Sequence, residues 1–365
     1  MDPVLDSAVI DSVVIGAGQA GLSASYHLSR RGISHLVLDA NTTPGGAWQH
    51  RWDALTMHDV HRVADLPDAP VPPAVGPERA NSFVPAYFAD YEATHALPVV
   101  RPVVVRAVRE ADGLLRVESD DGRSWLTRTV VNASGTWRRP FVPRYPGAET
   151  FAGEQLHTVE YPGPQHFRGQ RVVVVGGGAS AVQFLGALRP VTDTLWVTRR
   201  EPVWRTEPFD PEAGSAAVAM VAERVRQGLP PRSVVSVTGL MLREQEREAE
   251  RLGAYERRPM FDRIEADGVR WDDPLDDLPA FEPVDVILWA TGFRPDVSHL
   301  APLHLRTPAG GIQLDADGTT AVADRRVQLV GYGPSASTIG ANRAGRFAAR
   351  GVARVLAAAS SPAPH

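Results

Sequence analysis

Near its beginning the chain reads Val13-Val14-Ile15-Gly16-Ala17-Gly18-Gln19-Ala20-Gly21, an apolar run that enters a Gly-x-Gly-x-x-Gly turn. A helical stretch from Leu22 to Arg31 follows, so the turn joins a strand to a helix. In such a turn the first glycine permits the tight bend, the second lets backbone approach a pyrophosphate, and the third lets helix pack against strand. The helix N-terminus adds free N–H groups and a positive dipole end. We therefore predict a dinucleotide site that includes Gly16, Gly18, Gln19, Ala20 and Gly21.

A carboxylate follows where this kind of site requires one. The short apolar run His35–Leu38 ends at Asp39, about twenty residues after the glycines, and an acidic side chain there accepts hydrogen bonds from a ribose. Further along, the apolar stretch Val130–Asn132 runs into a small-small-Gly turn, which lets the chain pass close to a cofactor. The predicted site, of the FAD or NAD type, is completed by Asp39, Ala133, Ser134 and Gly135.

The same pattern occurs a second time. The apolar run Arg171–Val175 enters Gly176-Gly177-Gly178-Ala179-Ser180-Ala181, in which alanine takes the third glycine position, and a helical stretch follows. A second closing turn, Ala290-Thr291-Gly292, comes after the apolar stretch Ile287–Trp289. The residues predicted to contact this second nucleotide are Gly176, Gly178, Ala179, Ser180, Ala181, Ala290, Thr291 and Gly292.

The two copies differ at one informative position. Counted from the first glycine, Arg199 stands where Asp39 stands in the first copy, and Arg200 follows it. A guanidinium suits a 2′-phosphate through charge-assisted hydrogen bonds, whereas a carboxylate suits a free 2′-hydroxyl. The second copy therefore predicts NADPH, with Arg199 and Arg200 as ligands of its phosphate. The alternative is that both arginines form a solvated strand end.

Two such copies predict an α/β fold made of two dinucleotide-binding, Rossmann-like domains, with the NADPH domain inserted into the FAD domain. The domain boundary is expected inside the proline-rich connector Arg138–Pro164. The expected domains are residues 1–160 for the first part of the FAD domain, 161–284 for the NADPH domain, and 285–365 for the C-terminal part of the FAD domain. Turn signals at Asp112-Gly113 and Asp121-Gly122 predict a small antiparallel ribbon formed by residues 103–108, 114–118 and 124–131.

Composition excludes several function classes. The net charge of the 365 residues is −5, and no basic run with interleaved aromatics suggests a nucleic-acid partner. The absence of cysteine excludes disulfide redox chemistry, thiolate metal sites and cysteine nucleophiles. No apolar stretch approaches the length of a membrane span, and Met1-Asp2-Pro3 does not begin a signal peptide. We expect a cytoplasmic protein, without a membrane partner and able to form a homodimer.

One cluster has the residue types of a metal site. His58, Asp59 and His61 lie in a proline-rich stretch, and no second cluster of ligand types accompanies them. Such residues are more often ordinary surface than metal ligands, so we expect no metal.

With both units placed, the chain resembles the class B flavin-dependent monooxygenases, which include flavin-containing and Baeyer–Villiger monooxygenases, and in particular their small bacterial members. The most specific match is the segment Phe151–Tyr161, which fits the pattern Phe-x-Gly-x-x-x-His-x-x-x-Tyr/Phe of this family at every defined position. Gly45-Gly46-Ala47-Trp48 matches its Gly-Gly-x-Trp segment, and residues 290–295 match its Ala-Thr-Gly-Tyr/Phe turn. Tyr161 stands where Baeyer–Villiger enzymes usually have tryptophan, which favours the branch that oxidises heteroatoms.

The resemblance extends the expected FAD contacts. Trp48 is expected at the flavin, with core packing as the alternative, and residues 331–340 resemble a C-terminal flavin-contacting segment. Ser337 and Thr338 are placed to meet the flavin or simply to cap the helix that follows. The contacts added to the predicted FAD site are Gly46, Trp48, Gln49, Arg51, Val105, Ser337 and Thr338.

The resemblance implies that NADPH reduces FAD and that a C4a-(hydro)peroxyflavin then oxygenates a small nucleophilic substrate, an amine or sulfide, less readily a ketone. The alternatives are an NADPH-dependent flavin reductase or oxidase, and a non-catalytic sensor that binds FAD and NADPH. The candidate catalytic residues are His157 of the fingerprint segment and Asn81. For His157 the alternative is a structural histidine that binds the connector backbone.

Overall fold

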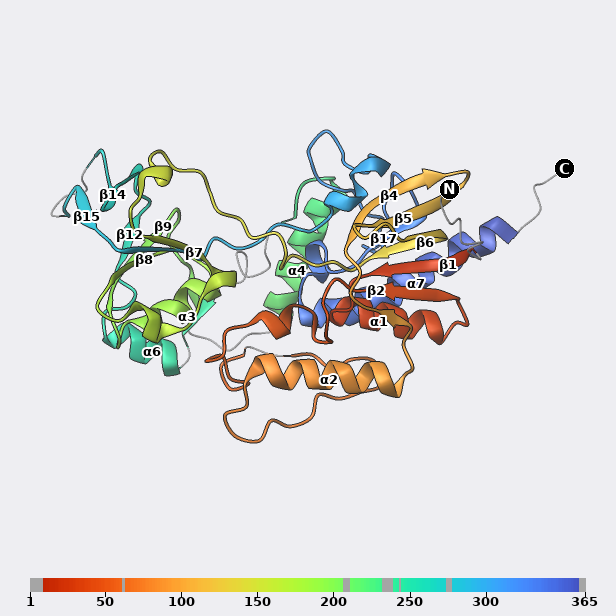
Figure 1. Cartoon of the computed structure of the whole chain (residues 1–365), viewed down its shortest axis with the longest axis horizontal. Helices are drawn as coiled ribbons and strands as arrows, with labels where there is room; N and C mark the ends of the chain where they lie inside the picture. The colour runs from red at the N-terminus through yellow and green to blue at the C-terminus, as the bar shows by residue number, and fades with distance from the viewer. Residues whose placement is uncertain are drawn as a thin grey trace. The chain divides into compact units, whose positions relative to one another are not determined.

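The structure is a computed structural model that describes residues 9–60, 63–205, 211–231, 239–242, 244–273 and 278–360, of which 211–218, 241, 244, 245, 338, 339 and 360 are described by their backbone alone. The chain divides into two compact units, whose elements are labelled in Figure 1. Unit 1 comprises Met1–Arg138, Ala216–Val234 and Pro295–His365, and unit 2 comprises Arg139–Ser215 and Val235–Arg294.

A seven-stranded sheet forms the centre of unit 1, in the order β3-β2-β1-β6-β5-β4, and β17 pairs with β6 beside β5. The strands pair in parallel from β3 to β6 and at β17, whereas β4, β5 and the first half of β6 are antiparallel. Its strands are β1 (Ile10–Ile15), β2 (His35–Leu38), β3 (Val99–Val100), β4 (Val105–Ala111), β5 (Leu114–Ser119), β6 (Ser124–Asn132) and β17 (Val327–Leu329).

The ribbon predicted from the turn signals does not stand apart from the dinucleotide fold. Its last strand, β6, continues past the hairpin and pairs in parallel with β1, from Ile10↔Thr127 to Ile15↔Asn132. The predicted antiparallel ribbon is confirmed, because β4 pairs with β5 and β5 with the first half of β6 in antiparallel register, and it is continuous with the main sheet. The physical reason for this continuity is that the last four residues of β6, Thr129–Asn132, are buried on both faces, as in a strand inside a sheet that is covered on both sides.

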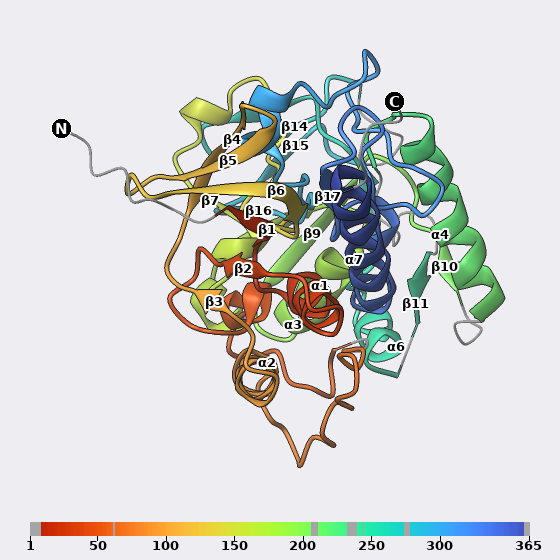
Figure 2. The same cartoon turned by 90° about the vertical axis from the view of Figure 1, so that its right-hand side faces the viewer.

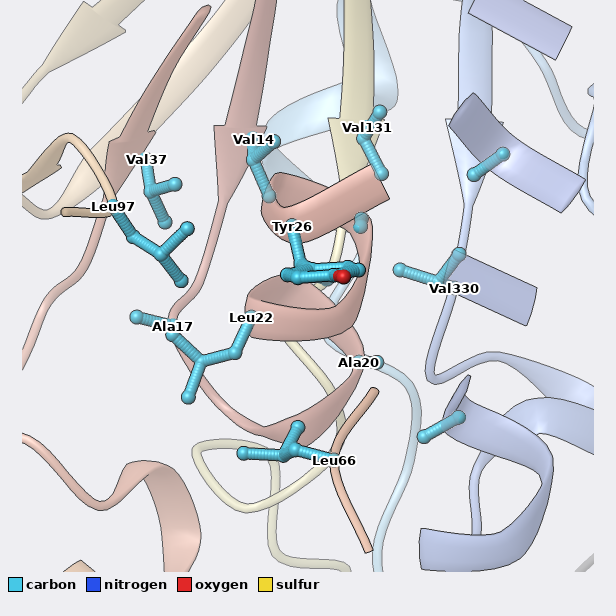
Figure 3. Close-up of a cluster of buried hydrophobic side chains, with 14 of the residues drawn as sticks. Val14, Ala17, Ala20, Leu22, Tyr26, Val37, Leu66, Leu97, Val131 and Val330 are labelled. Carbon is cyan, nitrogen blue, oxygen red and sulfur yellow. The ribbon is translucent and has the colours of Figure 1, made fainter. Parts of the chain in front are cut away.

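Alternate residues of β1 and β6 supply two cores. Val14 and Val131 face one core, together with Leu22 and Tyr26 of α1, as Figure 3 shows. Val13, Ile15 and Val130 face the other core, on the side of β4 and β5. The helices of unit 1 are α1 (Gln19–Ser29), α2 (Ala80–Thr94), α4 (Pro211–Arg226), which begins in unit 2, and α7 (Thr338–Ser360).

Helices α1 and α7 lie side by side on the first of these cores (Figures 1 and 2). Gly345 of α7 permits this contact, because a Cβ there would lie 2.4 Å from Oγ of Ser23 in α1. The C-terminal helix therefore completes the core beneath the first glycine turn.

Unit 2 is built on a five-stranded parallel sheet in the order β12-β9-β8-β16-β7. The sheet strands are β7 (Glu154–His157), β8 (Arg171–Val175), β9 (Asp193–Thr198), β12 (Arg257–Pro259) and β16 (Val286–Trp289). Its other elements are α3 (Ala179–Leu188), α6 (Glu244–Arg251), the antiparallel strands β13 (Arg263–Glu265), β14 (Gly268–Arg270) and β15 (Phe281–Pro283), and the short pair β10 (Trp204–Arg205) and β11 (Leu240–Met241).

The two units repeat one arrangement. In unit 1 the strand before the glycine turn, β1, lies between β2 and β6, and in unit 2 the strand before the glycine turn, β8, lies between β9 and β16. The boundaries of the units lie at 138/139 and 294/295 and differ from the expected 160/161 and 284/285; in addition, residues 216–234, expected in the NADPH domain, belong to unit 1. The physical reason is that β16 pairs with β7 on one side and with β8 on the other, which keeps residues 154–157 and 286–289 in unit 2.

Candidate functional site

The first glycine turn lies at the carboxyl ends of β1, β2 and β6, where Ile15 pairs with both Leu38 and Asn132. Gly16 has φ +102°, and a Cβ on it would lie 2.6 Å from the carbonyl oxygen of Ala133. A Cβ on Gly21 would lie 1.9 Å from the carbonyl oxygen of Gly16. Two of the three glycines are therefore required by contacts inside the protein.

Gly18 is different, because a Cβ on it would meet no protein atom within 4 Å and its backbone is extended, with φ −78°. Nothing in the fold explains a glycine there, whereas a pyrophosphate that approaches the backbone does. Gln19 and Ala20, which follow at the start of α1, are buried, and Gln19 donates from Nε2 to the carbonyl of Ala64 at 2.7 Å. The turn therefore fits the phosphates of a dinucleotide.

Asp39 lies at the end of β2 and is 3% exposed. Nε of Arg101 donates to Oδ2 of Asp39 at 3.0 Å, and the same guanidinium forms a bidentate pair with Glu92 of α2. Asn41 donates to Oδ1 of Asp39 from both its backbone and its side chain. These bonds fix the direction of the carboxylate, which suits an acceptor of ribose hydroxyls. Sequence reasoning missed Arg101.

The segment after Asp39 returns to the turn. A Cβ on Gly46 would lie 2.8 Å from Cα of Gly18, so η1 (Gly46–His50) begins beside the phosphate site. The guanidinium of Arg51 lies 4.4 Å from the ring centroid of Trp137 and 5.6 Å from that of Trp48. Burial lowers the pKa of Arg51 to about 10, and its buried Nε makes no hydrogen bond within the described part of the chain. A cation held this way fits an anionic ligand.

Other predicted FAD residues serve local structure. Gln49 donates to the carbonyls of Thr43 and Gly46, so its amide holds the loop. Val105 lies at the start of β4 beside a bulge and packs against the second core. Ser337 accepts from the backbone of Gly340 at 3.1 Å and caps α7. Thr338 begins α7, and its side chain lies outside the described part.

Asn81, the candidate catalytic residue, begins α2 next to the same segment. Its Nδ2 donates to the carbonyl of Arg51 at 3.0 Å and to Oδ1 of Asp53 at 2.8 Å. These bonds tie α2 to the loop that carries Arg51, which is a structural use of the amide.

The closing turn of unit 1 completes the site. Ala133 lies against Gly16, and Cα of Gly135 would lie 3.6 Å from a Cβ on Gly331 at the end of β17. Oγ of Ser134 donates to the backbone carbonyl of Asp296 and lies 3.1 Å from Oδ1 of Asn132. Ala133, Ser134 and Gly135 therefore lie beside the first glycine turn.

Unit 2 repeats this geometry at the carboxyl ends of β8, β9 and β16. A Cβ on Gly176 would lie 2.2 Å from the carbonyl oxygen of Ala290, and Ala181 is fully buried. Gly178 again has extended backbone, φ −109°, and open space where its Cβ would be. Ala179 and Ser180 begin α3 beside it. The second turn therefore also fits the phosphates of a dinucleotide.

Arg199 and Arg200 are exposed and directly follow β9. A third cation, missed by sequence reasoning, lies at the same strand end. Arg257 of β12 donates from Nε to Oγ1 of Thr198 at 2.7 Å and pairs with Glu201 at 3.3 Å. Because β12 pairs with β9 in parallel, Arg257, which is distant in the sequence, lies near Arg199 and Arg200 at the carboxyl end of β9.

His157 ends β7 and is 2% exposed. Its Nε2 donates to the carbonyl of Gly292 at 3.0 Å, and its Nδ1 accepts from the backbone of Val159 at 3.3 Å. Thr291 beside it donates to the carbonyl of Phe141. Burial lowers the pKa of His157, so the ring is neutral with both nitrogens in use. It is placed to hold the closing turn of unit 2 rather than to exchange protons with a substrate.

The described part of the chain contains no group of three or more His, Cys, Asp or Glu side chains that could hold a metal ion, and His61 lies outside that part. Asp59 accepts from Thr56 at 2.7 Å. Among the helices described, none is long and apolar enough to cross a membrane.

Comparison with known proteins identifies the family. Residues 10–327 match the pyridine nucleotide-disulphide oxidoreductase family. A flavin-containing monooxygenase from Stenotrophomonas maltophilia is 38% identical, with a TM-score of 0.81 over 96% of this chain and 99% of that one. The bacillithiol disulfide reductase of Staphylococcus aureus, at 16% identity and a TM-score of 0.67, shows the same fold only.

Two curated relatives are also named monooxygenases. An indole-3-pyruvate monooxygenase of Oryza sativa is 34% identical over 47% of this chain and 43% of its own length, and a Baeyer–Villiger monooxygenase of Streptomyces coelicolor is 30% identical over 59% and 44%. The chain spans about half the length of the curated relatives it matches. The FAD and NADPH expected from the sequence are the cofactors of this group. The chain belongs to the pyridine nucleotide-disulphide oxidoreductase family and, within it, to the flavin-dependent monooxygenases.

Proposed function

We propose that this protein is an NADPH- and O2-dependent flavoprotein monooxygenase, with FAD on unit 1 and NADPH on unit 2. The observation that carries the proposal is the matched pair of glycines, Gly18 and Gly178. A Cβ on either of them would have no protein atom within 4 Å, so a ligand can approach the backbone there. Family membership supplies the cofactors, and when bound they supply hydride transfer and oxygen activation. The protein's task is to bind, orient and exclude water.

On unit 1, backbone N–H groups after Gly18 would hold the pyrophosphate of FAD, and Asp39 would accept its ribose hydroxyls. Arg101 and Asn41 keep that carboxylate oriented. Arg51 is the cation available to the anionic part of the cofactor, since its guanidinium lies over the ring of Trp137 and its buried Nε bonds none of the described residues.

On unit 2, Gly178 would admit the pyrophosphate of NADPH, and Arg199 with Arg200 would bind its 2′-phosphate. Arg257 reinforces the positive charge of that strand end. His157 acts as a positioning residue, because its bond to Gly292 fixes the turn that would lie against the nucleotide.

A small nucleophile is the proposed substrate, an amine or a sulfide. Because two relatives are named indole-3-pyruvate monooxygenase and Baeyer–Villiger monooxygenase, ketones are also included among the substrates to be assayed. The cytoplasmic location and the homodimer stay predictions.

The decisive experiment uses the purified holoprotein. Under anaerobic conditions NADPH should bleach the bound flavin, and readmitted air should restore it. With a thioether present, sulfoxide should form in proportion to the NADPH consumed, because one oxygen atom enters the product and the other leaves as water. A hydrogen peroxide yield equal to NADPH, with no oxygenated product from a panel of thioethers, amines and ketones, would identify a reductase or oxidase instead. Flavin that NADPH does not bleach would identify a non-catalytic binding protein.

A further inference from the structure

A buried histidine lies beside the closing turn of unit 1. His299, in η5 (Ser298–Leu303), is 5% exposed, and its Nε2 lies 2.7 Å from Oδ1 of Asn132 at the end of β6. Because an amide oxygen can only accept, Nε2 carries the hydrogen of this bond. Burial lowers the pKa of His299, which keeps the ring neutral at pH 7.

The side chain of Asn132 connects His299 to the closing turn. Oγ of Ser134 lies 3.1 Å from the same Asn132 oxygen and also donates to the backbone carbonyl of Asp296. The backbone N–H of Asp296 in turn donates to the carbonyl of Gly135 at 2.9 Å. The residues at 132, 134 and 135 are thus each tied to the segment 296–299.

The position of this turn matters for the first glycine turn. A Cβ on Gly16 would lie 2.6 Å from the carbonyl oxygen of Ala133, so the two turns touch without spare room. A shift of the closing turn by a few tenths of an ångström therefore alters the bend at Gly16, and with it the N–H groups that follow. In unit 2 the corresponding turn is held by His157, directly through the carbonyl of Gly292.

We propose that His299 is a positioning residue for FAD: by donating from Nε2 to Asn132 it fixes the 133–135 turn against the glycine turn that binds the cofactor. The proposal rests on the binding of FAD by unit 1, and it assigns His299 no chemical step. Each dinucleotide turn then has its own neutral imidazole, His299 in unit 1 and His157 in unit 2.

The test compares two amides at position 299. A glutamine places its NH2 where the imidazole has Nε2, whereas an asparagine places it nearer to Nδ1, short of Asn132. FAD is removed from the wild-type protein and from His299→Gln, His299→Asn and His299→Leu, and FAD titration gives the dissociation constant of each. The visible circular dichroism of the rebound flavin reports its orientation. His35→Leu is the matched control, because His35 bonds Ser25 and Ile33 in the same unit and not the turn.

We expect His299→Leu and His299→Asn to raise the FAD dissociation constant about five- to tenfold and to change the flavin dichroism. His299→Gln should remain within about twofold of wild type, and His35→Leu should leave both readouts unchanged. Equal dissociation constants for the glutamine and asparagine variants would overturn the proposal, even if His299→Leu fails to fold. A wild-type protein that does not rebind FAD would refute the proposed function instead.

Discussion

Single residues separate the requirements of the fold from those of the ligand. Gly16 and Gly21 in unit 1 are needed because neighbouring backbone oxygens occupy the place of a side chain, whereas Gly18 faces open space. The same division holds in unit 2 between Gly176 and Gly178. Substitution of the second glycine of each turn should therefore affect binding and leave folding intact.

We expect Gly18→Val to fold and to purify without colour, because the added methyl groups block the approach of a pyrophosphate. Gly178→Val, the matched control, should keep its flavin and raise the NADPH half-saturation concentration at least tenfold. Both backbones are extended, so valine adopts them without strain. Flavin content per chain and far-ultraviolet circular dichroism measure the outcome. Full flavin content in Gly18→Val would show that the FAD site lies elsewhere.

At the scale of elements, we propose that the end of β9 determines which nicotinamide cofactor is used. Strands β8 and β12 fix β9 from both sides, and Arg199 and Arg200 follow it in an exposed position. Arg257 reaches the same place from β12. The positive charge thus belongs to a strand end with a fixed backbone, which is the requirement for discriminating a phosphate from a hydroxyl.

Replacing both Arg199 and Arg200 by serine should raise the NADPH half-saturation concentration about ten- to a hundredfold and leave that for NADH nearly unchanged. The reason is that each charge-assisted contact to the 2′-phosphate contributes roughly 1.5–3 kcal/mol, and NADH lacks that group. Steady-state kinetics with both cofactors measure the effect. Arg168→Ser, which removes an exposed guanidinium before the amino end of β8, is the control and should change neither value. Equal use of NADH and NADPH by the wild-type protein would contradict the assignment.

At the scale of the whole molecule, neutral histidines set the response to acid. Burial lowers the pKa of five histidines in the described part of the chain: His27, His35, His50, His157 and His299. Unfolding returns each to its ordinary pKa of about 6.5, so the unfolded chain binds more protons just below that pH. Their contribution to stability is complete above about pH 6.5 and is lost as the pH falls toward the folded-state values.

The thermal unfolding midpoint should consequently decrease when the pH is lowered from 7.5 to 5.5. The decrease should be about 2–4 °C for each kcal/mol of unfolding free energy that is lost. The carboxylates of Glu110, Asp121 and Glu265, whose pKa values are lowered by arginine partners, act only at more acid pH and do not obscure this range. Calorimetric scans at both pH values measure the shift. His299→Gln should reduce it, and an unchanged midpoint in the wild type would contradict the assignment of neutral imidazoles.

The sequence alone determined both nucleotide turns and the α/β class, because a strand–turn–helix with its glycines is encoded within about twenty-five consecutive residues. The order of β2, β1 and β6, and its repetition in unit 2, follows from the same local units. The fingerprint histidine was also visible, although its bond to Gly292, 135 residues away, was not.

Only the tertiary structure decided which distant side chains serve these turns. Arg101 reaches Asp39 across 62 residues, and His299 reaches Asn132 across 167. The structure also joins the predicted ribbon to the main sheet, because the second half of β6 is buried on both faces and pairs with β1. Such pairs carry no local pattern: whether a buried carboxylate or imidazole finds its partner depends on how strands far apart in the sequence align, and hydrophobic burial decides that alignment over the whole sheet.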